Sequence, residues 1–89
     1  MTYHLRILTP DGLRFDGQAR SLTVPALCGQ LGVLANHVNL VTALGTGTAK
    51  VVTEAGTRHA LCQSGVLTVT DGEVRLLAAS FEWAEAGEG

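Results

Sequence analysis

Several features that mark large protein classes are scarce in this 89-residue sequence. Aromatic residues make up 4% of it and charged residues 16%, with a net charge of −2. A near-neutral chain with few aromatic rings has little with which to neutralise phosphates or to stack bases, so nucleic-acid binding is not expected. No apolar run approaches the roughly 18 residues of a membrane span, and the N-terminus does not read as a targeting peptide. We therefore expect one small cytosolic domain.

Cysteine is equally rare, with Cys28 and Cys62 as the two examples and no C-x-x-C pair. Two cysteines are too few for a disulfide-dense secreted scaffold. We predict that both thiols are reduced and unpaired.

Motifs for catalysis, metal binding and nucleotide binding are also missing. His4, His37 and His59 have no neighbouring His or Cys that would complete a local zinc half-site, and solvated histidines are the simpler interpretation. Residues 44–50 lack the spacing of a phosphate-binding loop, and Ser64 lacks the first glycine of a nucleophile elbow. Both segments are interpreted as turns between strands. We predict a protein that is not an enzyme and that uses no metal or cofactor.

Turn residues recur at short intervals, which favours many short strands joined by hairpins. The turns are Asp-Gly, Pro-Asp-Gly and Ala-Gly, and the stretches between them are rich in β-branched residues, which restrict helix formation. The expected strands are residues 3–9, 13–15, 18–25, 48–53, 58–63, 65–70 and 73–79, with a short strand at 33–34. The pattern predicts an all-β sandwich of two sheets packed face to face.

Residues 26–39 differ from this pattern and are interpreted as a long loop. Long loops in compact domains are often functional. The mixture of apolar and small polar residues suits a surface that docks another protein, and a loop packed against its own sandwich is the alternative.

The last ten residues change character. Glu82, Glu85 and Glu88 favour a solvated acidic tail at 81–89, which follows a domain at 1–80. Trp83 either covers an edge of the sandwich or waits for a partner.

Several motifs occur together in one order and cover residues 1–80. They are M-T-Y-H-L at the start, T-P-D-G with F-D-G, G-x-L-G-V-L-x-N-H, L-V-T-A-L, S-G-x-L-x-V and V-x-L-L-A. In this combination the chain resembles the N-terminal domain of the epsilon subunit of F-type ATP synthases, called delta in mitochondria.

The resemblance implies a flattened β-sandwich of two roughly five-stranded sheets. It implies a non-catalytic place in the rotating central stalk, where the domain links the gamma subunit to the c-ring and couples proton or sodium flow to ATP synthesis. A sandwich face with spare apolar residues would pack on gamma. The chain would associate with the membrane only through the complex, at the cytoplasmic face of the bacterial inner membrane.

The same resemblance assigns site residues by position. The implied c-ring contact is formed by Gly29, Gln30, Leu31 and Gly32. The implied contact to gamma and the ring is formed by His37, Val38, Asn39, Leu40, Val41 and Thr42. Gln30 stands where many members have an acid, which replaces a charge pair with neutral hydrogen bonding.

The C-terminal helical hairpin of the family is missing from the sequence. The short acidic tail is too short to reach the catalytic head, so we expect a subunit that couples without inhibiting hydrolysis and that does not bind ATP. The competing hypothesis is a free-standing β-sandwich that binds a small ligand or peptide. An apolar cavity inside the sandwich would favour this rival, whereas an exposed apolar face would favour the stalk role.

Overall fold

The computed structural model describes residues 1–27, 29–36 and 38–84, and across these ranges the chain forms strands and turns but no helix. The predicted all-β class is therefore confirmed. The strands are β1 (Tyr3–Thr9), β2 (Gly12–Ala19), β3 (Ser21–Ala26), β4 (Gly29–Leu34), β5 (Leu40–Thr53), β6 (Gly56–Thr70) and β7 (Glu73–Trp83).

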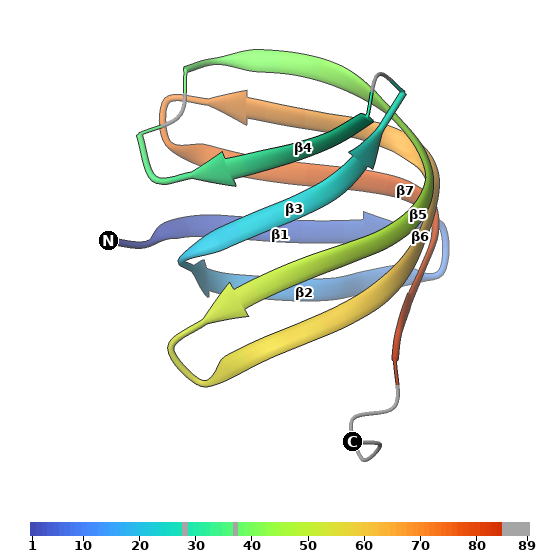
Figure 1. Ribbon diagram of the computed structural model, residues 1–89, viewed down its shortest axis with the longest axis horizontal. Coiled ribbons are helices and arrows are strands. Elements are labelled where there is room, and N and C mark those ends of the chain that lie inside the picture. The colour runs from blue at the N-terminus through green and yellow to red at the C-terminus, as the bar shows by residue number, and fades with distance from the viewer. Residues whose placement is uncertain (28, 37, 85–89) are drawn as a thin grey trace.

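The described strands belong to one continuous sheet with the order β2-β1-β7-β6-β5-β3-β4. The sheet is folded over on itself, because β5, β6 and β7 curve from one layer into the other (Figure 1). The first layer contains β2, β1 and the halves of β7, β6 and β5 nearest to them. The second layer contains the other halves with β3 and β4. Two layers were expected, but as separate sheets; here three long strands are shared between them.

The three shared strands bend between the layers at a point that we call the corner. At the corner, the alternation of buried and exposed residues along each strand shifts by one position. In β5 the buried positions pass from Leu44 to Ala49, in β6 from Cys62 to Leu67, and in β7 from Ala78 to Phe81. Each step covers an odd number of residues, whereas a regular strand repeats every two. This shift keeps the core-facing side chains of each strand pointing into the core on both sides of the corner.

This corner corrects two sequence-based interpretations. The glycine-rich stretch at 45–47 and Ser64 were interpreted as turns between strands, but both lie inside continuous strands at the corner. Glycine and a break in alternation occur at sheet corners as well as at turns, so the sequence pattern alone did not separate the two cases.

Gly65 lets β6 and β7 approach closely at this corner. A Cβ atom on Gly65 would overlap the carbonyl oxygen of Leu77 and would lie 2.8 Å from the Cα of Ala78. The obstacle is backbone, which cannot rotate away as a side chain can. Its neighbour Ser64 has a positive φ of 35°, a conformation uncommon for a residue with a side chain.

The predicted long loop at 26–39 was expected to carry only a short strand at 33–34, whereas the structure has a strand of six residues there. β4 spans Gly29–Leu34 and pairs with β3 in an antiparallel hairpin, with Ala26 opposite Gly29. Only the connection after Leu34 lacks regular structure among its described residues. Two glycines and a glutamine lower the strand propensity of β4, and the pairing with β3 outweighs this preference.

Two hydrogen bonds tie the layers together away from the corner. The buried hydroxyl of Tyr3 in β1 donates to the carbonyl of Val33 in β4 over 2.8 Å. The amide of Arg20 donates to the carbonyl of Val52 over 2.7 Å where the chain crosses from β2 to β3. The first of these bonds satisfies a buried hydroxyl, as a polar group removed from water requires.

The core lies between the two layers and consists mainly of aliphatic side chains. Its largest fully buried side chains are Phe81, Leu5, Ile7, Leu22, Leu67 and Leu76. Each such side chain contributes about 1.5–3 kcal/mol on burial. Among the described residues no charged side chain is buried, and the buried hydroxyl of Tyr3 has its hydrogen-bond partner, so packing and backbone pairing stabilise the domain.

Trp83 covers an edge, which decides between its two possible roles. Its indole nitrogen donates to the carbonyl of Arg14 in β2 over 3.3 Å, and its ring packs edge-on against Phe81 at 5.1 Å. The guanidinium of Arg58 lies 3.7 Å above the same ring, a cation–π contact. β7 thus continues three residues past the expected boundary at residue 80.

The corner predicts a strong effect of Gly65→Ala. The added Cβ forces β6 and β7 apart, and we expect the free energy of unfolding to fall by about 2–4 kcal/mol. Urea denaturation would measure the loss. The matched control is Gly32→Ala, where nothing lies within 4 Å of the added Cβ and the midpoint should hardly move. Equal midpoints for both variants would contradict the role of Gly65.

Candidate functional site

The outer face of the first layer carries an unbroken row of apolar side chains, one from each of its five strands. Register pairs Leu8 with Leu13, Leu8 with Leu77, Leu77 with Val66, and Val66 with Ala43. Directly paired residues point to the same side of a sheet. Leu13, Leu77 and Val66 are 54%, 47% and 40% exposed. We call Leu13, Leu8, Leu77, Val66 and Ala43 the apolar row.

Two further exposed apolar residues lie beside this row. The amide of Leu27 bonds to the carbonyl of Ala43, which brings the β3–β4 turn to the β5 end of the row. Val41 is also highly exposed and lies two residues before Ala43 on the same face. A contiguous apolar surface on a small domain marks an interaction site more often than scattered exposed residues do.

Polar rows follow the apolar row on the same face. The next row holds Asp16, Arg6, Arg75 and Thr68, and the row after it holds Gln18, His4, Glu73 and Thr70. The face therefore changes from apolar to charged along the strand direction, as the centre and the rim of an interface do.

His4 is held between two carboxylates in these polar rows. Its Nε2 lies 2.5 Å from Asp16 on β2, and its Nδ1 lies 2.9 Å from Glu73 on β7. Both ring nitrogens donate only in the imidazolium form. The hydrogen bond to Asp16, followed by the bond to Glu73, raises the pKa of His4, and the bond to His4 lowers the pKa of Asp16. His4 was expected to be a solvated strand histidine; it is partly exposed but paired.

The residues predicted to contact the c-ring lie together on β4 and at its start. Gly29, Gln30 and Gly32 are exposed on this edge strand, next to Leu27. Leu31 is different, because it is half-buried and packs against the core.

The second predicted segment is divided in the same way. His37 lies outside the described residues. Val38 and Val41 are exposed, whereas Leu40 is half-buried against the core. Asn39 is exposed and has a structural contact, since its Oδ1 accepts from the amide of Asp71 over 2.8 Å. Thr42 pairs with the buried Leu67 and is half-buried.

The apolar row is the feature that sequence reasoning missed. Leu8, Leu13, Val66 and Leu77 occur on strands whose alternate residues are apolar anyway, so each looks like an ordinary core candidate. Their alignment depends on the register between five strands, and the parallel pairing of β1 with β7 joins residues far apart in sequence.

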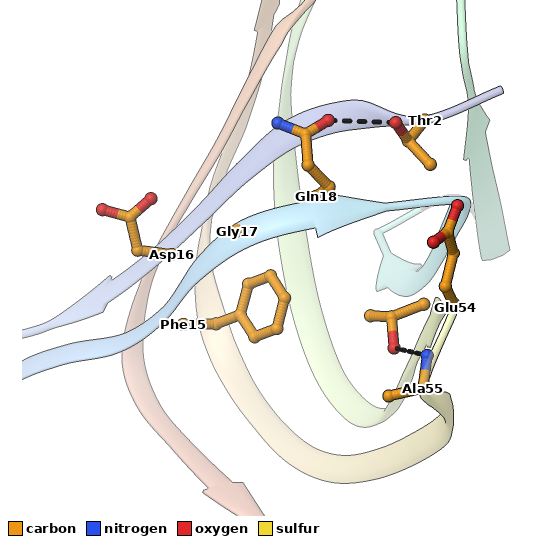
Figure 2. Close-up of a pocket in the computed structure, with 8 residues that line it drawn as sticks. Thr2, Phe15, Asp16, Gly17, Gln18, Glu54 and Ala55 are labelled. Carbon is orange, nitrogen blue, oxygen red and sulfur yellow. Dashed lines mark hydrogen bonds between the residues drawn. The ribbon is translucent and has the colours of Figure 1, made fainter.

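A cleft of about 440 Å³ opens between β2 and the β5–β6 turn (Figure 2). Phe15 faces the turn, whereas Asp16 and Gln18 lie on the opposite side of the strand. Several of its polar groups already pair: Thr2 bonds to Gln18 over 3.0 Å, and the amide of Ala55 bonds to Thr53 over 3.1 Å. The cleft is lined by a strand edge and a turn, and it is not an apolar cavity inside the sandwich.

The described residues give less support to other kinds of functional site. Within residues 1–27, 29–36 and 38–84, no group of three His, Cys, Asp or Glu residues could hold a metal ion. The same ranges hold no helix long and apolar enough to span a membrane. Cys62 is free and buried, and burial raises the pKa of its thiol. Cys28 lies outside the described residues.

The described residues thus form an all-β domain whose first layer presents an exposed apolar face. A family model described as "ATP synthase, Delta/Epsilon chain, beta-sandwich domain" matches residues 2–84. The chain belongs to this family, which confirms the resemblance found in the sequence.

Individual relatives agree with this assignment. An ATP synthase epsilon chain of a Synechococcus species is 37% identical over 82 residues, which cover 92% of this chain and 60% of that protein. The epsilon chain of Parasynechococcus marenigrum is 34% identical over 89 residues, 100% of this chain and 65% of that one. This chain thus spans less than two thirds of each relative.

A solved structure has the same fold. One chain in the cryo-EM structure of the Euglena gracilis mitochondrial ATP synthase, in an assembly of OSCP, F1 and c-ring, superposes with a TM-score of 0.86. The two sequences are 22% identical, and the match covers 98% of this chain and 58% of the other.

The His4 cluster predicts a specific titration. We expect NMR to place the pKa of His4 above its ordinary value of 6.5, and Asp16→Asn to lower it more than Glu73→Gln does. The stabilisation from His4 is fully present below pH 6.5 and is lost as the pH rises through the raised value. The contribution of Asp16 has the opposite sign, since it is lost as the pH falls below about 3.8. A His4 pKa at or below 6.5 would contradict the cluster.

Proposed function

We propose that this chain is a non-catalytic subunit of the central stalk of an F-type ATP synthase, where it joins the gamma subunit to the c-ring. Membership of the delta/epsilon family supports the complex, and the epsilon-chain relatives support the subunit. Its role is mechanical: it couples the flow of protons or sodium ions to ATP synthesis by holding rotor parts together.

The apolar row is the observation that carries this proposal. Three of its side chains are between 40% and 54% exposed on a sheet face that nothing in the described chain covers. Removing apolar area from water contributes about 25 cal/mol per Å², so a partner that covers the row gains affinity. We assign the gamma subunit to this face.

The c-ring contact is assigned to Gly29, Gln30, Leu31 and Gly32. Leu27 links this strand to the apolar row through its bond to Ala43, so the two contacts are neighbours on one continuous surface. Exposed backbone and the amide of Gln30 suit hydrogen bonds to polar loops of the ring. Leu31 contributes mainly by packing β4 against the core.

The contact between these two surfaces is assigned to His37, Val38, Asn39, Leu40, Val41 and Thr42. Val41 extends the apolar surface beyond the row. Asn39 and Leu40 position the segment from behind, through Asp71 and the core.

The subunit then lies at the membrane surface as part of the complex, on the cytoplasmic face of the bacterial inner membrane. The alternative function, a free-standing module for a small ligand or peptide, has weaker support. Its expected feature was an apolar cavity inside the sandwich, whereas the cleft in Figure 2 lies at a strand edge and a turn.

Leu77→Asp tests the gamma contact. A charge at the middle of the apolar row would be desolvated without a partner, and we expect it to cost about 2 kcal/mol or more of binding free energy. Isothermal calorimetry with the cognate gamma subunit would measure it. Leu61→Asp is the matched control, because Leu61 is also 47% exposed but lies on the outer face of the second layer. Equal affinities of the two variants would refute the assignment of this face.

Gln30→Arg tests the ring contact. A bulky cation on the exposed edge should weaken binding to membrane sectors stripped of this subunit by about tenfold. Gln63→Arg, an exposed change on the outer face of the second layer, should bind like the unchanged chain. Co-sedimentation with the membranes would measure both, and an unaltered Gln30→Arg variant would remove Gln30 from the contact.

A further inference from the structure

A small hollow lies on the same outer face as the apolar row. It has a volume of about 300 Å³ and is lined by Thr68 and Thr70 of β6 and by Glu73 and Arg75 of β7. Arg75 is paired directly with Thr68, and Glu73 with Thr70. Because Arg75 is two residues from Leu77 along β7, the hollow lies about 7 Å from the apolar row.

Arg75 is a cation without a fixed partner in this hollow. The ion pairs of the described residues engage Arg6, which lies 3.5 Å from Asp16, and Arg14, which lies 3.7 Å from Asp11. None of them includes Arg75. The hydroxyls of Thr68 and Thr70 likewise make no side-chain hydrogen bond within the described parts of the chain. One guanidinium and two hydroxyls therefore remain available to an acceptor.

The acidic wall of the hollow already has a hydrogen-bond partner. The carboxylate of Glu73 lies 2.9 Å from Nδ1 of His4, whose other nitrogen is held by Asp16. The charges that face His4 are thus Asp16 from β2, Glu73 from β7 and the nearby Arg6 from its own strand. The contact with His4 directs the carboxylate of Glu73 toward β1.

We propose that this hollow is a socket for the carboxylate of an acidic side chain of the gamma subunit, with Arg75 as its anchor. The inference rests on the proposed function and adds to it the chemistry of the partner. A guanidinium binds a carboxylate through two parallel hydrogen bonds, which fixes direction as well as charge. The socket therefore sets the register of the partner, while the apolar row supplies most of the contact area.

The partner is defined by this geometry. It presents an apolar ridge to the row and an Asp or Glu about 7 Å to the side that faces the polar rows. A basic side chain does not fit as well, because Arg75 repels it and Glu73 is occupied by His4.

Three single variants of the full chain test the socket by calorimetry with the cognate gamma subunit. We expect Arg75→Gln to weaken binding about tenfold, and this loss to shrink at high salt. The charge-matched control Arg20→Gln, an exposed arginine outside the outer face, should stay within about twofold. Glu73→Gln should bind more tightly than the unchanged chain, because it removes a negative charge from the wall of the socket.

The outcomes separate the two proposals. Loss of binding in Leu77→Asp with unchanged binding in Arg75→Gln would overturn the socket and keep the gamma face. No binding by the unchanged chain would overturn the proposed function and the socket with it. Weaker binding of Glu73→Gln, together with tighter binding of Arg75→Gln, would show that the hollow takes a cation and would also overturn the proposal. Arg75 is exposed, so thermal unfolding should confirm that both variants remain folded.

Discussion

Backbone contact between β6 and β7 at Gly65 is the constraint on which the rest of the domain depends. A side chain at this position would separate the strands, so the sheet could not turn its corner. Without the corner, β5, β6 and β7 would extend as one flat layer, and the apolar faces of β1 and β3 would have nothing to pack against. The core therefore depends on the bend. The bend makes two layers from a single sheet, and Leu5, Leu22 and Phe81 are buried between these layers.

The same bend also determines which side chains lie on the outer face of the first layer. By shifting the phase of three strands, it gives the first layer an outer face on which apolar, basic and histidine-containing rows follow in order. A flat face of this kind is well suited to a rigid protein partner. The edge strand β4 and the turn before it lie next to the same surface through Leu27, so one small domain can contact two partners at once.

Local patterns were enough to predict the all-β class, most strand positions and the family. They were insufficient where structure depends on pairing between distant residues. The stretch at 44–50 was assigned to a turn because glycine is common in both turns and corners. Only residues 33–34 of β4 were predicted as a strand, because the glycines at its start have low strand propensity. The apolar row and the His4 cluster could not be predicted, since both require the register of β1 against β2 and β7. The predicted ring residues came from the family resemblance rather than from local patterns, and Leu31 among them packs against the core.

The parallel pairing of β1 with β7 also has a consequence for biosynthesis. His4 meets Glu73 across 69 positions of sequence. The edge of β1 that does not pair with β2 therefore stays unpaired until β7 has been synthesised. Until then, the side chains of Leu5 and Ile7 are covered by the β1–β2 hairpin alone and remain largely exposed to water. Chains dominated by pairing between distant residues fold slowly, and they expose unpaired, aggregation-prone strand edges during folding. We therefore expect the domain to close only after β7 has been released.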